Sequence, residues 1–367
     1  MVKLVDPIIG DEEKRAVMEV LNSGMIAQGP KTQKLEEEFA KFCGTKYAIA
    51  VNSGTSALHT ALYALGIKPG DEVITTPFTF VATANSIIMQ GATPIFADID
   101  SKTFNLDPKD VEKKITEKTK AIIPVDLFGQ IYDYSYIKEI AQKHGLYILE
   151  DAAQAVGAEL EGQKAGSFGD IGAFSLYATK NLISGEGGII TTNNEELMER
   201  AKMFRHHGQS EKTRYEYYDL GYNYRMTDIQ AAIALEQLKK IDSLNEKRIQ
   251  NAFFLNQGLS NIKCLKVPYV NQGNKHVYHQ YTVKITPEAN LTRDQVKEEL
   301  TKRGIGCAVY YPKPLHLHPF FKKMGYKEGD FPVAEEMSKR VLSLPVQPKL
   351  TKEEIERVIT TIKEILI

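Results

Sequence analysis

Strand-like and helix-like segments alternate regularly from about residue 45 to residue 195, and this alternation limits the possible folds most strongly. Short apolar runs indicate buried strands at 47–51, 72–76, 93–97, 121–125 and 146–149. The stretches between them have helical spacing, and one opens with Asp107-Pro108, an N-cap followed by proline. The pattern predicts βαβ units, and therefore a mostly parallel sheet with helices on both faces. Ligands bind such sheets at the carboxyl ends of the strands.

The alternation stops near Thr227, and a different organisation follows. Thr227-Asp228-Ile229-Gln230 is a capping box, which predicts a long helix reaching about Leu259. The remaining pattern predicts a strand at 280–285, a helix at 292–303, a strand at 307–311, and helices from Pro332 and Thr351. A chain of 367 residues is long enough for two domains. We expect a large domain of residues 1–240 and a smaller C-terminal α/β domain of residues 241–367.

Composition excludes several classes of protein. The net charge is −1, and Lys and Glu are interleaved, which argues against a nucleic-acid binder. No apolar run approaches the ~20 residues that span a bilayer, and the N-terminus has no signal-peptide core. Three isolated cysteines favour a reducing compartment. We therefore expect a cytoplasmic protein without membrane or nucleic-acid partners. The Asp and His pairs at 98/100, 206/207 and 316/318 lack a complete ligand set, so no metal is expected.

Two residues suggest a specific cofactor chemistry. Lys180 lies between a short apolar strand and the glycine-rich run 184–188, and Asp151 ends the apolar strand of residues 146–149. A lysine can hold the aldehyde of pyridoxal phosphate as a Schiff base, and a carboxylate can keep the pyridine nitrogen protonated. Taken singly, each has a simpler interpretation: Lys180 as a surface lysine and Asp151 as a helix N-cap.

Other residues would complete such a site. Gly54 and Thr55 lie between a strand and a helix, where a helix N-terminus offers N–H groups to a phosphate. Ser175 could reach the same phosphate through its hydroxyl. Phe80 follows the end of the next strand and could stack on a flat ring. The simpler interpretations are a helix N-cap at 53–55 and a core aromatic at position 80.

Longer motifs resemble one family of enzymes. The chain contains Ser-Leu-Tyr-Ala-Thr-Lys180-Asn-Leu, Glu-Asp151-Ala-Ala-Gln154, Ser-Gly54-Thr-Ser-Ala, Gly-Tyr-Asn223-Tyr-Arg225-Met and Tyr-Pro-Lys-Pro-Leu-His316. These motifs, with the opening run at 24–30, resemble the DegT/DnrJ/EryC1/StrS sugar aminotransferases in order and over nearly the whole chain.

The resemblance implies a fold and a role for each matching residue. The expected fold is α/β, of the aspartate-aminotransferase-like fold type I, with a mixed, mostly parallel sheet in the large domain. The resemblance implies that Lys180 forms the Schiff base with pyridoxal phosphate and acts as general acid/base, while Asp151 pairs with the pyridine nitrogen. The remaining expected contacts are Gln154 near the phenolic oxygen, Phe80 on the ring, Gly54, Thr55, Ser175 and the neighbouring subunit's Asn223 at the phosphate, and Tyr310, His316 and Arg225 near the substrate.

The resemblance also implies the reaction. An amino donor, expected to be glutamate, converts the cofactor to pyridoxamine phosphate, which then aminates C3 or C4 of a nucleotide-linked ketosugar in a homodimer with shared sites. Three alternatives are weighed against this. A sugar dehydratase of the family is expected to have histidine at position 180, and an amino-acid aminotransferase usually has a carboxylate-binding Arg that residues 309–321 lack. A DNA-binding regulator should be more basic.

Overall fold

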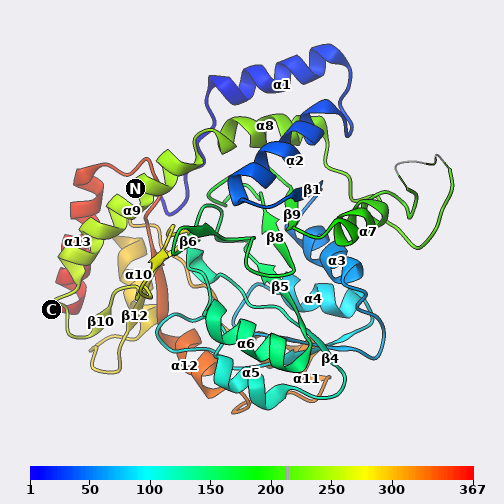
Figure 1. Ribbon diagram of the computed structural model, residues 1–367. Helices are drawn as coiled ribbons and strands as arrows, with labels where there is room; N and C mark the ends of the chain where they lie inside the picture. The colour runs from blue at the N-terminus through cyan, green and yellow to red at the C-terminus, as the bar shows by residue number, and fades with distance from the viewer. Residues whose placement is uncertain (211–212, 214) are drawn as a thin grey trace.

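The computed structural model describes residues 1–210, 213 and 215–367 (Figure 1). These residues build a seven-stranded sheet with the order β1-β9-β8-β5-β4-β2-β3. Its strands are β1 (Tyr47–Val51), β2 (Glu72–Thr75), β3 (Thr93–Phe96), β4 (Thr119–Ile122), β5 (Tyr147–Asp151), β8 (Ile171–Ser175) and β9 (Gly188–Thr192). β9 runs antiparallel to both of its neighbours, and the other pairs are parallel. The expected mixed, mostly parallel sheet is confirmed.

Helices cover both faces of this sheet. On one face α3 (Gly54–Ala64), α4 (Ala82–Met89) and α7 (Glu195–Arg205) pack with the strands in one buried cluster. On the other face the cluster contains residues of α2 (Pro30–Cys43), α5 (Pro108–Lys114), α6 (Tyr134–His144) and α8 (Asp228–Leu238). Helix α1 (Asp11–Ser23) lies outside, against α8 (Figure 1). Because both faces are covered, the strands read as continuous apolar runs.

The helix expected from Thr227 to Leu259 is two helices, so that prediction is wrong in its continuity. Its start is correct, since the Thr227 side chain accepts a hydrogen bond from the Gln230 backbone N–H as the capping box requires. The first helix, α8, ends at Leu238, and α9 (Ile241–Leu259) continues in a new direction (Figure 1). At the break, Lys240 Nζ pairs with Glu13 Oε1 of α1 at 2.8 Å. The break lets α8 pack on the large sheet and α9 on a second core.

That second core surrounds a three-stranded antiparallel sheet. The sheet has the order β10-β12-β13, from β10 (Leu265–Lys266), β12 (Tyr281–Ile285) and β13 (Val341–Leu344). The helices of this part are α10 (Arg293–Lys302), α11 (Pro319–Lys322), α12 (Pro332–Arg340) and α13 (Lys352–Leu366). Short elements complete the chain: β6 (Glu159–Leu160), β7 (Gln163–Lys164), β11 (Asn274–Lys275), and the 3-10 turns η1 (Leu127–Gly129) and η2 (Leu315–Leu317).

The strand expected at 307–311 does not form, and this prediction is wrong. Ala308 makes one isolated bridge to Ser343 of β13, and the pairing goes no further. The following side chains, Val309 to Tyr311, pack instead with Leu315 and Phe331 in a separate apolar cluster. The place next to β12 belongs to β13, which the sequence pattern did not identify.

The N-terminus packs against the C-terminal part of the chain. Val2 is 1% exposed and belongs to the same buried cluster as Leu255, Val283 and Leu342. Its backbone pairs with Ile305, while Ile8 O accepts a hydrogen bond from Gln237 Nε2 of α8 at 2.8 Å. The first eight residues thus connect the two cores. The domain boundary at 240/241 stays a prediction. Among the described residues, no helix is both long and apolar enough to cross a membrane.

Candidate active site

Lys180 is held on a tight connection between β8 and β9. After Ser175 the chain leaves β8, and its backbone bonds back to the glycine-rich return segment: Ala178 N–H donates to Gly185 O at 3.0 Å. The Lys180 N–H donates to Tyr177 O at 2.8 Å. Gly185 has a φ of 85°, a conformation that glycine adopts without strain. The lysine therefore stands at the carboxyl end of β8 on a defined backbone.

The electrostatic surroundings favour the neutral amine of Lys180. Burial lowers the pKa of Lys180 to about 8, and the nearby Asp151 carboxylate partly opposes that shift. With such a pKa, roughly one molecule in ten carries the unprotonated amine at pH 7. An ordinary surface lysine has a far smaller neutral fraction. Lys180 is thus suited to attack an aldehyde or to exchange a proton.

Asp151 lies at the end of β5 and is 3% exposed. Its Oδ2 accepts a hydrogen bond from Thr83 Oγ1 at 2.7 Å, and its Oδ1 accepts one from Ala153 N–H at 3.2 Å. Burial raises the pKa of Asp151, whereas the bond from Thr83 and the charge of Lys180 lower it. A buried carboxylate of this kind is stabilised in its ionised form by a cationic partner.

Gln154 connects the loop after β5 to the segment at 310–311. Its Oε1 accepts a hydrogen bond from Phe128 N–H at 2.9 Å, and its Nε2 donates to the Tyr311 hydroxyl at 3.3 Å. The Tyr311 ring meets Phe78 edge to face, with centroids 6.1 Å apart. The loop after β5 and the segment at 310–311 therefore meet in space.

Gly54, Thr55 and Ser175 form a compact cradle. Ser53 caps α3 by accepting a hydrogen bond from Ser56 N–H at 3.1 Å, so Gly54 and Thr55 occupy its first turn. The first N–H groups of a helix have no intrahelical partners and attract anions. A Cβ built on Gly54 would lie 2.8 Å from Ser175 Cβ, so only glycine lets the two approach. The cradle joins the start of α3 to the end of β8.

Phe80, Asn223 and Arg225 lie on the open side. The Phe80 side chain is 59% exposed, and its carbonyl oxygen lies 3.2 Å from Thr83 Oγ1. The stretch from Asn223 to Arg225 runs beside β1, where Asn52 Nδ2 donates to Asn223 O at 3.4 Å. Arg225 Nη1 is 2.7 Å from His206 Nδ1. All three side chains border solvent in the single chain.

Tyr310 and His316 differ in their positions. Tyr310 is partly exposed beside Tyr311, with ring centroids 6.1 Å apart. His316 is fully buried: its Nε2 lies 2.9 Å from Glu335 Oε1, and its ring packs against Phe331. As folded, His316 packs beside the apolar cluster that contains Leu315 and Phe331, and its expected contact with a substrate stays a prediction. The preceding segment, Pro312-Lys313-Pro314-Leu315, gives no sign that His316 is buried.

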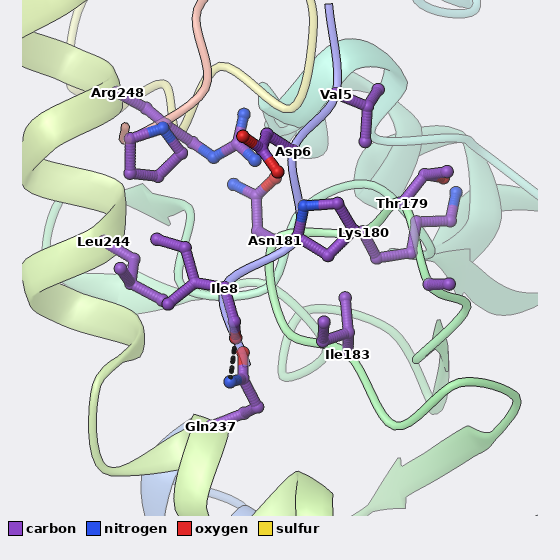
Figure 2. Close-up of a pocket in the computed structure, with 13 residues that line it drawn as sticks. Val5, Asp6, Ile8, Thr179, Lys180, Asn181, Ile183, Gln237, Leu244 and Arg248 are labelled. Carbon is purple, nitrogen blue, oxygen red and sulfur yellow. Dashed lines mark hydrogen bonds between the residues drawn. The ribbon is translucent and has the colours of Figure 1, made fainter. Parts of the chain in front are cut away.

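A small cavity lies behind the lysine (Figure 2). Its volume is ≈ 20 Å³, room for about one water molecule. The N-terminal segment from Val5 to Ile8 crosses it, and Arg248 of α9 lies on the side away from Lys180 (Figure 2). Asn181 lies between Arg248 and Lys180 in this view. Burial lowers the pKa of Arg248 to about 10.

Sequence reasoning missed two contributors to the site. Thr83, on α4, bonds Asp151 directly, although a threonine inside an apolar helix gives no local signal of such a role. Asn181 follows the lysine and bonds to residues far along the chain. Its only signal is adjacency to Lys180. The described residues contain no cluster of His, Cys, Asp or Glu suited to a metal ion.

Comparison with known proteins shows the family of this chain. Residues 7–363 match the DegT/DnrJ/EryC1/StrS aminotransferase family. The chain belongs to this family. It is 44% identical to the spore coat polysaccharide biosynthesis protein SpsC of Bacillus subtilis, over 98% of this chain and 96% of that protein. It is 40% identical to a UDP-N-acetyl-3-dehydro-alpha-D-glucosamine 3-aminotransferase of Acidithiobacillus ferrooxidans, over 97% and 94%.

Solved structures confirm the fold. The crystal structure of S. venezuelae DesV in complex with a ketimine intermediate superposes with a TM-score of 0.92 at 38% identity, covering 96% of this chain and 94% of that one. The expected fold type I architecture is thereby confirmed, and the chain is a pyridoxal-phosphate-dependent sugar aminotransferase.

The residues present fit this cofactor. The cradle has no room for a side chain at Gly54, and the start of α3 offers N–H groups there. Both features suit a phosphate. Asp151 is buried and accepts a hydrogen bond from Thr83 on one oxygen. Burial raises its pKa, so its ionised form calls for a cationic partner, and a pyridinium N–H would be such a partner. Lys180 lies close enough to Asp151 for their charges to interact.

Proposed function

We propose that this enzyme transfers an amino group from an amino-acid donor, glutamate, to C3 or C4 of a nucleotide-linked ketosugar. The observation that carries the proposal is the electrostatic pairing of Lys180 with a buried, hydrogen-bonded Asp151 next to the Gly54 cradle. The names of the relatives support the substrate class, since one acts on a UDP-linked 3-dehydro sugar and another serves polysaccharide biosynthesis. The product would be an amino sugar for such a pathway.

Each site residue has a part in this proposal. Gly54, Thr55 and Ser175 bind the cofactor phosphate, and Phe80 stacks on the ring from the exposed side. Gln154 lies near the phenolic oxygen, held by Phe128 N–H. Tyr310 and Arg225 face the substrate.

Lys180 carries out the proton transfers. When bound, the cofactor supplies an electron sink that stabilises negative charge at the substrate carbon. Lys180 holds the cofactor before reaction and then moves a proton between two carbon atoms as general base and acid. Its pKa of about 8 matches that task at neutral pH. Thr83 and Ala153 fix the Asp151 carboxylate, which would pair with the ring nitrogen and keep it protonated.

We further propose a homodimer in which Asn223 reaches the cofactor phosphate of the other subunit. Large apolar side chains in the neighbourhood of Asn223 and in the turn after α1 are exposed, which supports a covered surface there: Met25 53%, Ile26 51%, Tyr217 63% and Leu220 65%. We place the reaction in the cytoplasm, supported by three free thiols, Cys43, Cys264 and Cys307.

The test loads the full-length protein with pyridoxamine phosphate and offers a panel of nucleotide-linked 3-keto and 4-keto sugars. Mass spectrometry should detect one sugar that gains an amine, and the absorbance of the bound cofactor should change in equal amount. The Lys180→Ala protein is the matched control and should aminate none. Amination of 2-keto acids alone would instead identify an amino-acid aminotransferase.

A further inference from the structure

We propose that Asn181 is a positioning residue for Lys180, and that it works through a hydrogen-bonded chain from α9 and the segment before β12. The proposal rests on the proposed function in one respect, the role of Lys180 as the cofactor-binding lysine. Asn181 follows Lys180 directly and is 6% exposed.

The amide of Asn181 makes three bonds to distant parts of the chain. Its Nδ2 donates to Val277 O at 3.1 Å and to Asn245 Oδ1 of α9 at 2.8 Å, and its Oδ1 lies 3.2 Å from His279 Nδ1. Asn245 Nδ2 in turn donates to Val156 O at 2.9 Å. The chain therefore ties the lysine's connection to the loop after β5, to α9 and to the segment leading into β12.

Two backbone carbonyls determine which group donates and which accepts in each of these hydrogen bonds. A carbonyl oxygen can only accept, so Val277 O requires the NH₂ group of Asn181, and Val156 O requires that of Asn245. The Asn181 oxygen then faces His279, whose Nδ1 must carry the hydrogen. His279 is therefore the neutral Nδ1–H tautomer or the cation. Burial, together with the charges of Lys180 and Arg248, lowers the pKa of His279 well below its usual range, which leaves the neutral tautomer.

The position of this chain explains its effect on Lys180. Ionisable groups face this region from four elements: Asp151 of β5, Arg248 of α9, Asp6 of the N-terminal segment, and His276 and His279 before β12. Asn181 lies between Lys180 and Arg248 in the view of Figure 2, and all three line the small cavity. With its amide saturated by protein partners, Asn181 limits the open space beside the lysine to that cavity and so keeps the amine desolvated. Removing it should admit water and let the lysine hold its proton more strongly.

The experiment measures the pH at which the free amine of Lys180 is half-protonated. In the cofactor-free full-length protein, Lys180 is modified with an amine-selective reagent over a range of pH and quantified by peptide mass spectrometry. Asn181→Ala should raise the apparent pKa of Lys180 by about one unit.

Two further variants separate positioning from general stability. Asn251 of the same helix α9 is also buried and donates to Val346 O and Gln347 O, at 3.3 and 3.0 Å, so Asn251→Ala loses comparable bonds away from Lys180. It should lower the melting temperature and leave the Lys180 pKa unchanged. His279→Asn keeps an N–H donor for Asn181 and should retain the wild-type pKa, whereas His279→Leu should shift it as Asn181→Ala does.

An unchanged Lys180 pKa in Asn181→Ala, or in His279→Leu if the first variant does not fold, overturns the inference. An equal shift in Asn251→Ala also overturns it, because the effect would then follow lost stability. Absence of any cofactor attachment at Lys180 would contradict the proposed function instead. The labelling of the cofactor-free protein would still decide the role of Asn181.

Discussion

Thr83 Oγ1 donates a 2.7 Å hydrogen bond to Oδ2 of Asp151, which joins the first turn of α4 to the end of β5. Thr83 Oγ1 also lies 3.1 Å from Thr79 Oγ1, which can donate to it, and 3.2 Å from the Phe80 carbonyl. The short bond to Asp151 takes the single hydroxyl hydrogen and fixes the carboxylate proposed for the ring nitrogen. This bond favours the ionised form of Asp151 against the effect of burial.

The first prediction concerns this bond. Thr83→Val keeps the shape and removes the donor, and hydrogen bonds to charged groups contribute about 1.5–3 kcal/mol, so kcat/KM should fall roughly 10- to 100-fold. Thr83→Ser keeps the hydroxyl and should stay within a few-fold of wild type. Steady-state kinetics with the accepted ketosugar provide the measurement. Equal activity of the Val and Ser variants would show that the bond has no role in catalysis.

The second prediction concerns the charge of Asp151. Asp151→Asn keeps the bond from Ala153 N–H but cannot hold a pyridinium proton, so kcat should fall by about 10²–10³-fold or more. Asp170 is the matched control, because it accepts Ile148 N–H at 2.8 Å at the opposite end of β5. Asp170→Asn should change stability and leave kcat near wild type. A similar loss in both variants would point to the strand rather than to the charge.

The third prediction concerns the cradle. Gly54→Ala places a Cβ 2.8 Å from Ser175 Cβ, and overpacking costs about 1–3 kcal/mol, so cofactor affinity should fall roughly 5- to 100-fold. Equilibrium titration of the cofactor-free protein measures the loss. The double variant Gly54→Ala/Ser175→Gly regains room and should recover the melting temperature, but it lacks the Ser175 hydroxyl and should still bind weakly. Full recovery of affinity would show that the hydroxyl is not a phosphate ligand.

The fourth prediction concerns pH. The neutral amine of Lys180 is the reactive form, and its pKa is about 8. Below that pH each added unit should raise the rate of cofactor capture by the cofactor-free protein about tenfold, and above it the rate should level off. Stopped-flow absorbance at subsaturating cofactor measures the rate. A rise that continues toward pH 10 would mean that Lys180 behaves as an exposed lysine.

Local sequence patterns predicted the large domain better than the small one. Each βαβ unit is encoded by its own apolar runs and caps, so the strands ending at Asp151 and Ser175 could be located before the structure. The break at Lys240 could not, because it depends on α8 and α9 packing on different cores. The segment at 307–311 has strand-like composition, yet tertiary contacts with Phe331 take precedence.

The site shows the same division between local and distant information. Lys180, Asp151 and Gly54 stand at strand ends or helix starts, positions that a sequence pattern reveals. The burial of His316 against Glu335 and the bonds of Asn181 to Asn245 join residues 19 and 64 positions apart. Spacing within the sequence contains no information on such contacts.

The most direct test of the account is to reduce the holoenzyme with borohydride, digest it and locate the cofactor by mass spectrometry. A single peptide should carry the reduced cofactor on Lys180, and Lys180→Ala should give no covalent adduct. The pKa of about 8 at this amine and its interaction with Asp151 are the structural basis for that result. Attachment of the reduced cofactor to another lysine of the holoenzyme would contradict this role of Lys180. Amination of a ketosugar by the Lys180→Ala variant at the wild-type rate would contradict it as well.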